Sequence, residues 1–196
     1  MQSENNNFYY VSTLILIAAN VFIWNSILFS GGKNLELYFL DVGQGDSQLI
    51  NLPGDVQILI DGGPGAKTLL GLANSLNPVD RYIDLVILSH PQLDHFGGLI
   101  DVFRNYRVGA LIYNGQIGKA DAYKDLLKAV EENGAIRVVL HEGDRIEYKD
   151  YVLEILSPSS RVLASKEAND GGIVVMFKAP NLKALYTADI GFDLER

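Results

Sequence analysis

The sequence predicts a mixed α/β domain of the α+β type that follows an apolar N-terminal segment. Short β-prone runs bounded by Gly, Asp and Pro turns recur between Leu35 and Thr187. Segments whose apolar residues have helical spacing lie between several of these runs. The 196 residues are enough for one domain with a sizeable core. The pattern fits either one sheet covered by helices on both faces or two packed sheets.

The predicted elements begin with three short strands and continue with helices and strands in alternation. Gly54 and Asp55 predict a hairpin between the second and third strands. Asp94 is suited to cap the second helix, while Asp121 and Gly134 are suited to begin and end the third. Strands are expected at 35–40, 48–52, 57–60, 83–88, 108–113, 137–140, 151–156, 173–177 and 184–187, and helices at 67–76, 95–106 and 121–133.

The N-terminal segment differs from the rest because no charged residue occurs between Glu4 and Lys33. A helix over residues 8–29 would be ~33 Å long at ~1.5 Å per residue, enough to cross a bilayer. We predict a retained membrane anchor; a cleaved signal peptide or a buried core helix are the alternatives. A signal peptide is disfavoured because the segment lacks a basic start and a good cleavage site.

The expected organisation is therefore an N-terminal tail (1–7), a transmembrane helix (8–29), a linker (30–34) and a folded domain (35–196). This organisation predicts a single-pass membrane protein. Lys33, the nearest basic residue, weakly favours a cytoplasmic domain, so the orientation stays open.

The charge and the cysteine count limit the partners. The formal net charge of −8 argues against broad, non-specific binding of nucleic acid. It does not exclude a phosphate substrate, because bound metal ions would reverse the local field. The absence of cysteine excludes disulfides and leaves His, Asp and Glu as the metal ligands.

The stretch SHPQLDHFGG places two histidines and an aspartate within six residues, directly after a predicted strand. Imidazole and carboxylate ligands suit Zn²⁺, Mn²⁺ or Fe, so we predict that His90, Asp94 and His95 bind metal. The alternative is that Asp94 only caps a helix and that the histidines are satisfied polar residues. Gln92, a neutral amide, is a weak ligand at best.

Two further aspartates each follow a predicted strand. Asp61 is expected either to orient a metal-bound histidine or to form a turn. Asp189 is expected either to bridge two metal ions or to form a turn. His141, the third histidine, lies in a polar stretch and is expected to have a turn or surface role.

A glycine-bearing loop separates the first two predicted strands. Such loops can expose backbone N–H groups that hold an oxyanion, so a substrate-facing loop and a tight β-turn both remain open. The loop is not a phosphate-binding P-loop, because the spacing and the lysine are wrong. Its candidate residues are Gly43, Gln44, Gly45, Asp46 and Ser47.

Taken in this order, FLDVGQGDS, ILIDGG, SHPQLDHFGGL and YTADI resemble motifs of the metallo-β-lactamase superfamily. The resemblance is closest to the C-terminal domain of ComEC-type competence proteins, which act in DNA uptake, and it extends from about Leu35 onward. It implies an αββα sandwich of two sheets, with a site for two divalent ions, Zn²⁺ or Mn²⁺, at one edge. The reaction that it implies is hydrolysis, often of a phosphodiester.

The motif positions transfer to individual residues of this chain. By resemblance, His90, Asp94, His95 and Asp189 are metal ligands, and Asp94 also helps to position and activate the attacking water. Gln92 occupies a variable ligand position where His or Asp is usual, and Asp61 supports the site. Ala188 replaces a glycine, and the family's late histidine motif is not reached by residue 196, so we expect an incomplete domain.

The sequence thus supports two hypotheses of different kinds. The first is a membrane-anchored, metal-dependent hydrolase of the phosphodiesterase or nuclease type, with its domain on the extracytoplasmic side by family analogy. The second is a catalytically impaired module that keeps the fold in order to bind DNA or a partner. Gln92 and the acidic charge favour the second hypothesis.

Overall fold

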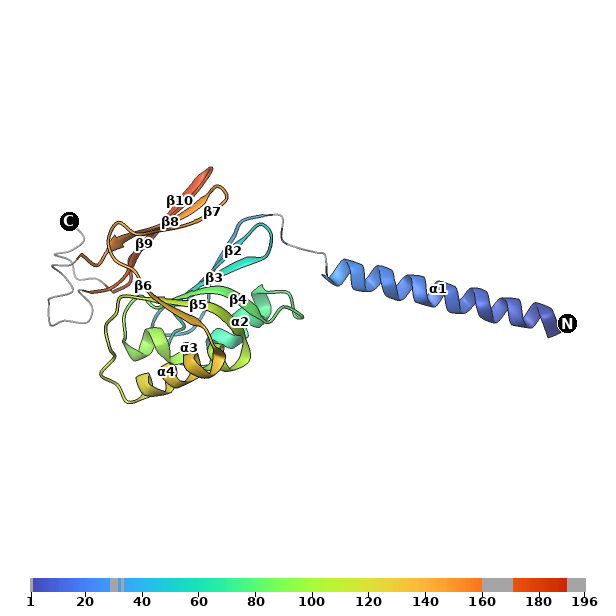
Figure 1. Ribbon diagram of the computed structural model, residues 1–196, viewed down its shortest axis with the longest axis horizontal. Helices are drawn as coiled ribbons and strands as arrows, with labels where there is room; N and C mark the ends of the chain where they lie inside the picture. Colours follow the sequence, from blue (N-terminus) through green and yellow to red (C-terminus); the bar gives the residue numbers. More distant parts are fainter. Residues whose placement is uncertain (1, 29–31, 33, 160–170, 190–196) are drawn as a thin grey trace.

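The computed structural model describes residues 2–28, 32, 34–159 and 171–189 (Figure 1). A long helix, α1, comes first, and three shorter helices lie within the folded domain. Their bounds are Gln2–Leu28 for α1, Lys67–Ser75 for α2, Leu93–Asn105 for α3 and Ala122–Asn133 for α4.

A six-stranded sheet forms the centre of the domain, with its strands in the order β1-β2-β3-β4-β5-β6. The first three strands pair antiparallel, whereas β3, β4, β5 and β6 pair in parallel. The parallel strands therefore end at the same edge of the sheet. The bounds are Glu36–Phe39, Gln48–Leu52, Val56–Ile60, Tyr82–Ile87, Arg107–Tyr113 and Ile136–Val139.

A second sheet has four antiparallel strands in the order β10-β9-β8-β7. Its bounds are Arg145–Tyr148 for β7, Tyr151–Ser157 for β8, Val174–Ala179 for β9 and Leu182–Tyr186 for β10. Of these, β7 was not among the predicted strands. Four residues that alternate charged and apolar side chains give too short a pattern to recognise.

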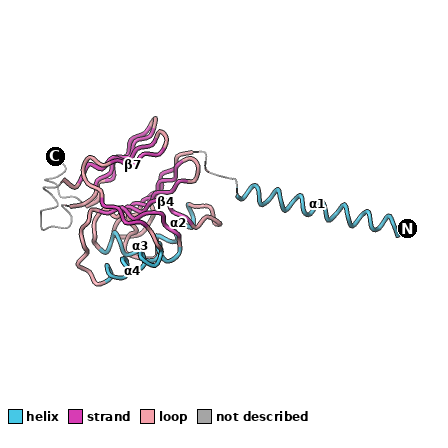
Figure 2. The backbone as a smooth tube through the Cα atoms, viewed as in Figure 1, coloured by secondary structure: helices cyan, strands magenta, loops and turns pink. Residues whose placement is uncertain are grey.

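The two sheets are packed face to face, and the helices α2, α3 and α4 cover the other face of the six-stranded sheet (Figures 1 and 2). Successive strand residues point to opposite faces. Leu59 accordingly belongs to the core beneath the helices, while Ile58 and Ile60 belong to the core between the sheets. Of the two arrangements that the sequence left open, the structure has two packed sheets, which confirms the mixed α/β sandwich.

The end of α4 agrees with the sequence analysis, whereas the start of α3 does not. Gly134 ends α4 with φ +79°, as predicted, because glycine adopts this left-handed conformation without strain. The prediction that Asp94 caps α3 is wrong, because the N-cap residue is Gln92. The Gln92 carbonyl accepts hydrogen bonds from the backbone N–H groups of His95 and Phe96, each at 3.0 Å. Asp94 lies within the first turn.

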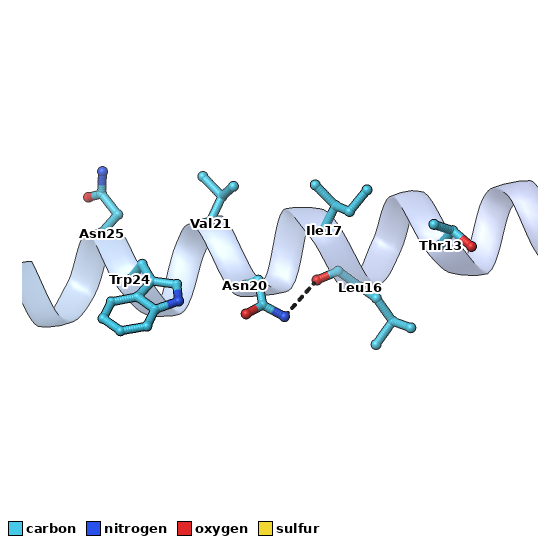
Figure 3. Close-up of a pocket in the computed structure, with 7 residues that line it drawn as sticks. All are labelled: Thr13, Leu16, Ile17, Asn20, Val21, Trp24 and Asn25. Carbon is cyan, nitrogen blue, oxygen red and sulfur yellow. Dashed lines mark hydrogen bonds between the residues drawn. The ribbon is translucent and has the colours of Figure 1, made fainter.

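The helix α1 extends from the domain and, among the described residues, has no extensive contact with another element (Figure 1). Its apolar side chains are exposed on several sides, for example Leu14, Phe22 and Trp24. The shallow hollow drawn in Figure 3 is lined by side chains of this helix alone, among them Asn20, whose amide donates to the Leu16 carbonyl oxygen at 3.3 Å.

The predicted transmembrane helix is not confirmed. Within residues 2–28, 32, 34–159 and 171–189, no helix is both long enough and apolar enough to span a bilayer. The end of that predicted segment and most of the predicted 30–34 linker lie outside the described residues. Gly32 is described, and the hairpin of β2 and β3 holds it: its N–H donates to Asp55 Oδ1 at 2.8 Å and its carbonyl accepts from Gly54 at 3.1 Å.

Candidate metal centre

The ends of β3 and β4 bring the central residues of the site together. These strands are parallel neighbours with Ile60 opposite Ile87, so the residues that follow them emerge side by side. Asp61 follows β3, and its N–H donates to the Ile87 carbonyl at 2.9 Å. Ser89 and His90 follow β4. Catalytic and binding groups in α/β proteins commonly lie at such carboxyl ends.

The Asp61 carboxylate connects this strand edge to helix α3. Its Oδ1 accepts from the Ser89 backbone N–H at 2.8 Å, and its Oδ2 accepts from the Ser89 hydroxyl at 2.5 Å. The same Oδ2 lies 2.8 Å from His95 Nδ1. A carboxylate cannot donate, so Nδ1 carries the proton, and in the neutral ring Nε2 is left as a free acceptor. The role expected of Asp61, to orient a histidine, fits this geometry.

His90 and His95 lie against each other in the interior, with 1% and 0% of their surfaces exposed. Their ring centroids are 4.1 Å apart. His90 Nδ1 is 3.1 Å from the Ser89 hydroxyl, whereas the Nε2 atoms of both rings are buried without a hydrogen-bond partner among the described residues. Two unpartnered buried nitrogens side by side are costly unless something else binds them.

Asp189, which follows β10, completes a group of three metal-ligand side chains. One ligand atom from each of His90, His95 and Asp189 lies within 4.8 Å of the others. Asp189 Oδ2 is 3.4 Å from His95 Nε2, and its side chain is 46% exposed. The two imidazoles and one carboxylate suit a borderline transition-metal ion such as Zn²⁺. The unpartnered Nε2 atoms point to the same conclusion, so the residues present fit a divalent cation.

The two histidines have opposite pKa shifts. Burial disfavours the charged form of His95, but the hydrogen bond and charge of Asp61, aided by Asp189, outweigh burial and raise the pKa to about 9. Burial, together with the charge of His95, lowers the pKa of His90, although hydrogen bonding to the Gln92 side chain acts in the other direction. The cation-free site therefore holds one imidazolium and one neutral imidazole near pH 7.

Two other motif residues are placed less centrally. The group of three ligands does not include Asp94, whose side chain is partly buried in the first turn of α3. The side chain of Gln92 hydrogen-bonds to His90. The assignments of Asp94 as a metal ligand and catalytic residue, and of Gln92 as a weak ligand, therefore stay predictions.

The glycine-bearing loop, residues 41–47, forms one wall of the site. The Ser47 hydroxyl donates to the Asp61 carbonyl at 3.1 Å, and the Asp46 carbonyl accepts from the Gly63 N–H at 2.8 Å. Gly45, with φ +96°, packs so closely that a Cβ there would lie 2.0 Å from the Asp94 carbonyl oxygen. The loop is thus held to both the β3 end and the start of α3.

A cavity of about 250 Å³ opens beside the histidines, between the edges of the two sheets. Asp46, Asp61 and Ser89 supply polar groups, and the remaining lining is mostly apolar. The other residues that line it are Phe39, Gln48, Ile60, Ile173, Leu185, Tyr186, Thr187 and Ala188. Sequence reasoning missed the Ser89 role; its position between a strand and His90 was the available signal.

Glycines let α3 approach this edge. A Cβ on Gly98 would lie 2.0 Å from the Gly62 carbonyl oxygen, and one on Gly97 would lie 2.3 Å from the Pro64 carbonyl oxygen. Neither position can hold a larger residue without a backbone shift. His141 lies elsewhere, in a turn where its N–H donates to Asp144 Oδ2 at 2.7 Å, and it is not part of the ligand group.

Comparison with known proteins identifies relatives of this arrangement. Over 174 residues the chain is 24% identical to ComE operon protein 3 of Bacillus subtilis (strain 168). The matched region covers 79% of this chain and 22% of that protein. The Rm3 metallo-beta-lactamase has a TM-score of 0.52 and 16% identity, over 80% of this chain and 59% of the other. CmlA, a diiron beta-hydroxylase from Streptomyces venezuelae, has a TM-score of 0.50 and 16% identity, over 81% of this chain and 30% of the CmlA chain.

The chain therefore spans only part of each of these relatives, about a fifth of the Bacillus protein. The two structural likenesses establish the fold alone, since one of those proteins is a lactamase and the other a hydroxylase. Residues 40–196 match the family model of the metallo-beta-lactamase superfamily, more than half of the sequence. The chain belongs to the metallo-beta-lactamase superfamily.

Proposed function

We propose that this protein is a metal-dependent hydrolase that cleaves phosphodiesters in nucleic acid and takes part in DNA uptake. The observation that carries the hydrolase proposal is the pair of buried histidines whose unpartnered Nε2 atoms lie beside Asp189. The similarity to ComE operon protein 3 supports the part concerning DNA uptake. The fold itself does not select the substrate.

In this proposal His90, His95 and Asp189 hold a divalent cation, Zn²⁺ or Mn²⁺, while Asp61 keeps His95 in the required orientation. Such a cation, when bound, supplies Lewis acidity and lowers the pKa of a water molecule. Three protein ligands leave room in the coordination shell for water and substrate. A second cation, which the sequence resemblance implies, would require Asp94 as a ligand.

The net charge of −8 places a condition on the substrate. A phosphodiester would be repelled by most of this surface, so its binding depends on a local positive charge at the site. We therefore expect nucleic acid to bind weakly in the absence of a divalent cation and more tightly in its presence.

The test uses the purified full chain in detergent, with elemental analysis and with a chromogenic phosphodiester and single-stranded DNA as substrates. The wild type should contain or bind a transition metal and cleave at least one substrate. His90→Ala should abolish cation binding and cleavage, whereas His141→Ala, which removes the histidine outside the ligand group, should leave both unchanged. A folded wild type that binds no divalent cation would refute the proposal.

A second candidate function is a module of this fold that binds DNA or a partner without catalysis. Two observations favour it: Asp94 lies outside the ligand group, and Gln92 contributes no charge. The same experiment separates the two candidates. A cation-binding wild type that cleaves neither substrate, and whose His90→Ala variant keeps its affinity for DNA, would support the binding module.

We also propose that residues 8–29 attach the protein to a membrane, with the domain on the extracytoplasmic side. The support is the exposure of apolar side chains on several sides of α1, such as Ile17, Phe22 and Ile23, which favours an apolar surrounding. The full chain should float with phosphatidylcholine vesicles in a density gradient, and a variant without residues 2–28 should stay in the soluble fraction. Equal behaviour of the two proteins would contradict this proposal.

A further inference from the structure

The arrangement of charges around the two histidines is the starting point for a further inference, which rests on the proposed cation site. Besides Asp189 and Asp61, a third carboxylate, that of Asp46, faces this part of the molecule. It comes from the glycine-bearing loop and lines the same cavity as Asp61 and Ser89.

The backbone around Asp46 fixes its place. The Asp46 carbonyl accepts from the Gly63 N–H at 2.8 Å, and the next residue, Ser47, donates its hydroxyl to the Asp61 carbonyl at 3.1 Å. On the other side, Gly45 rests against the Asp94 carbonyl. The backbone of the loop is therefore held on both sides of Asp46, which lines the cavity together with Asp61 and Ser89.

This placement is electrostatically unfavourable without a cation. Burial raises the pKa of the Asp46 carboxyl, and the negative charges of Asp61 and Asp189 act in the same direction, although the two histidines oppose them. Asp46 and Asp61 line the same cavity, so their carboxylates share a partly buried region. A carboxylate that stabilised the fold would instead have close donors, such as the Ser89 groups that bind Asp61.

We propose that Asp46 is an additional carboxylate of the cation site, supplied by the glycine-bearing loop and not by the histidine motif. It acts on the cation through its charge and through a hydrogen bond to a coordinated water, and is thus a positioning residue. Outer groups of this kind commonly change metal affinity by about 10–100-fold when they are lost.

A positioning role for Asp46 affects the cation affinity without lowering the thermal midpoint of the cation-free protein, whereas a structural role would lower both. Asp46→Asn keeps the shape of the side chain but removes its charge, so it should weaken cation binding. The same change should leave the thermal midpoint of the cation-free protein unchanged or raise it, because repulsion from Asp61 and Asp189 is relieved. A residue that merely supports the loop would lower that midpoint.

The experiment is isothermal titration of the full chain in detergent with Mn²⁺ alone, accompanied by thermal unfolding in a chelator. The matched control is Asp41→Asn, which removes an equal charge from an exposed position of the same loop. Asp46→Asn should lower the Mn²⁺ affinity by roughly tenfold or more, and Asp41→Asn by less than about twofold, as expected of a screened surface charge. Asp46→Glu should restore part of the affinity.

The outcomes distinguish a failure of the role of Asp46 from a failure of the cation site itself. Equal affinities of the Asp46→Asn and Asp41→Asn variants would overturn the role of Asp46 while the ligand group stands, provided that His90→Ala abolishes binding. A fall in the cation-free thermal midpoint of Asp46→Asn would also overturn it. A wild type that binds no Mn²⁺ would overturn both this inference and the proposed function.

Discussion

At the residue scale, the site depends on a few backbone positions that are unusual for their residue type. Asp61 has φ +57° and Ala188 has φ +52°, in the left-handed region that side chains other than glycine rarely adopt. Asp61 makes three contacts with Ser89 and His95 that hold it there. Ala188 has no comparable hydrogen bonds with the described residues to offset the strain, so its backbone conformation costs stability.

Replacing Ala188 by glycine should therefore stabilise the protein by about 1 kcal/mol, since glycine adopts this backbone conformation without strain. Urea unfolding of the cation-free protein measures the change. The control is Ala184→Gly, at a position of β10 without a positive φ, which should destabilise the protein instead. Destabilisation by both substitutions would show that Ala188 is not strained.

The His95 pKa predicts how stability depends on pH. In the cation-free fold this pKa is raised from 6.5 to about 9, so the charged ring stabilises the folded state. That contribution is fully present below pH 6.5 and is lost as the pH rises through 9. The free energy of unfolding, measured in a chelator, should therefore fall between these values, and a His95→Gln variant should show a flatter profile. A free energy of unfolding that rises between pH 6.5 and pH 9 would contradict the raised pKa of His95.

At the element scale, the junctions of β3, β4 and α3 determine where the ligands lie. The prediction of both strands and of a helix after His95 followed from apolar runs and turn residues. The start of α3 was misplaced because the Gln92 carbonyl, rather than the Asp94 side chain, begins the helical hydrogen bonding. Every residue has a backbone carbonyl, so a sequence pattern does not show which carbonyl begins a helix. The start of α3 could therefore not be predicted.

The close approach of α3 to the β3 end gives a test at this scale. Gly98→Ala should destabilise the protein by about 1–3 kcal/mol, because its Cβ would meet the Gly62 carbonyl oxygen. Gly65→Ala is the control: a Cβ there has nothing within 4 Å, so the effect should be small. Comparison of urea midpoints checks both variants. A neutral Gly98→Ala would mean that α3 can move away without cost.

At the scale of the whole molecule, the ligand group joins two sheets and residues far apart in the chain. The resemblance to a known family placed Asp189 with the histidines, whereas the strand pattern alone left a metal-bridging role and a turn equally open. Strand patterns specify which face of each sheet is apolar, but the relative position of two sheets depends on how their side chains interlock. For the same reason, the sequence left open whether the loop with Asp46 faces the site or only forms a turn, and the structure places Asp46 in the lining of the cavity.

The isolation of α1 predicts that the domain does not depend on it. A variant that begins at Gly32 keeps the hydrogen bonds of that residue to Asp55 and Gly54. It should unfold with a free energy within about 0.5 kcal/mol of the full chain in detergent, as expected when few contacts are lost. Circular dichroism during urea unfolding measures this. A large loss of stability would show that α1 supports the domain.

The position of Asp189 has a mechanical consequence. His90 follows β4 of the six-stranded sheet and His95 lies on the adjoining helix α3, whereas Asp189 follows the outermost strand of the other sheet. A cation bound by all three side chains would link the two sheets, so β10 could not separate from the rest of the domain without loss of the cation. Loading the site should then slow amide hydrogen exchange in β10 more than in β6, which lies at the far side of the six-stranded sheet.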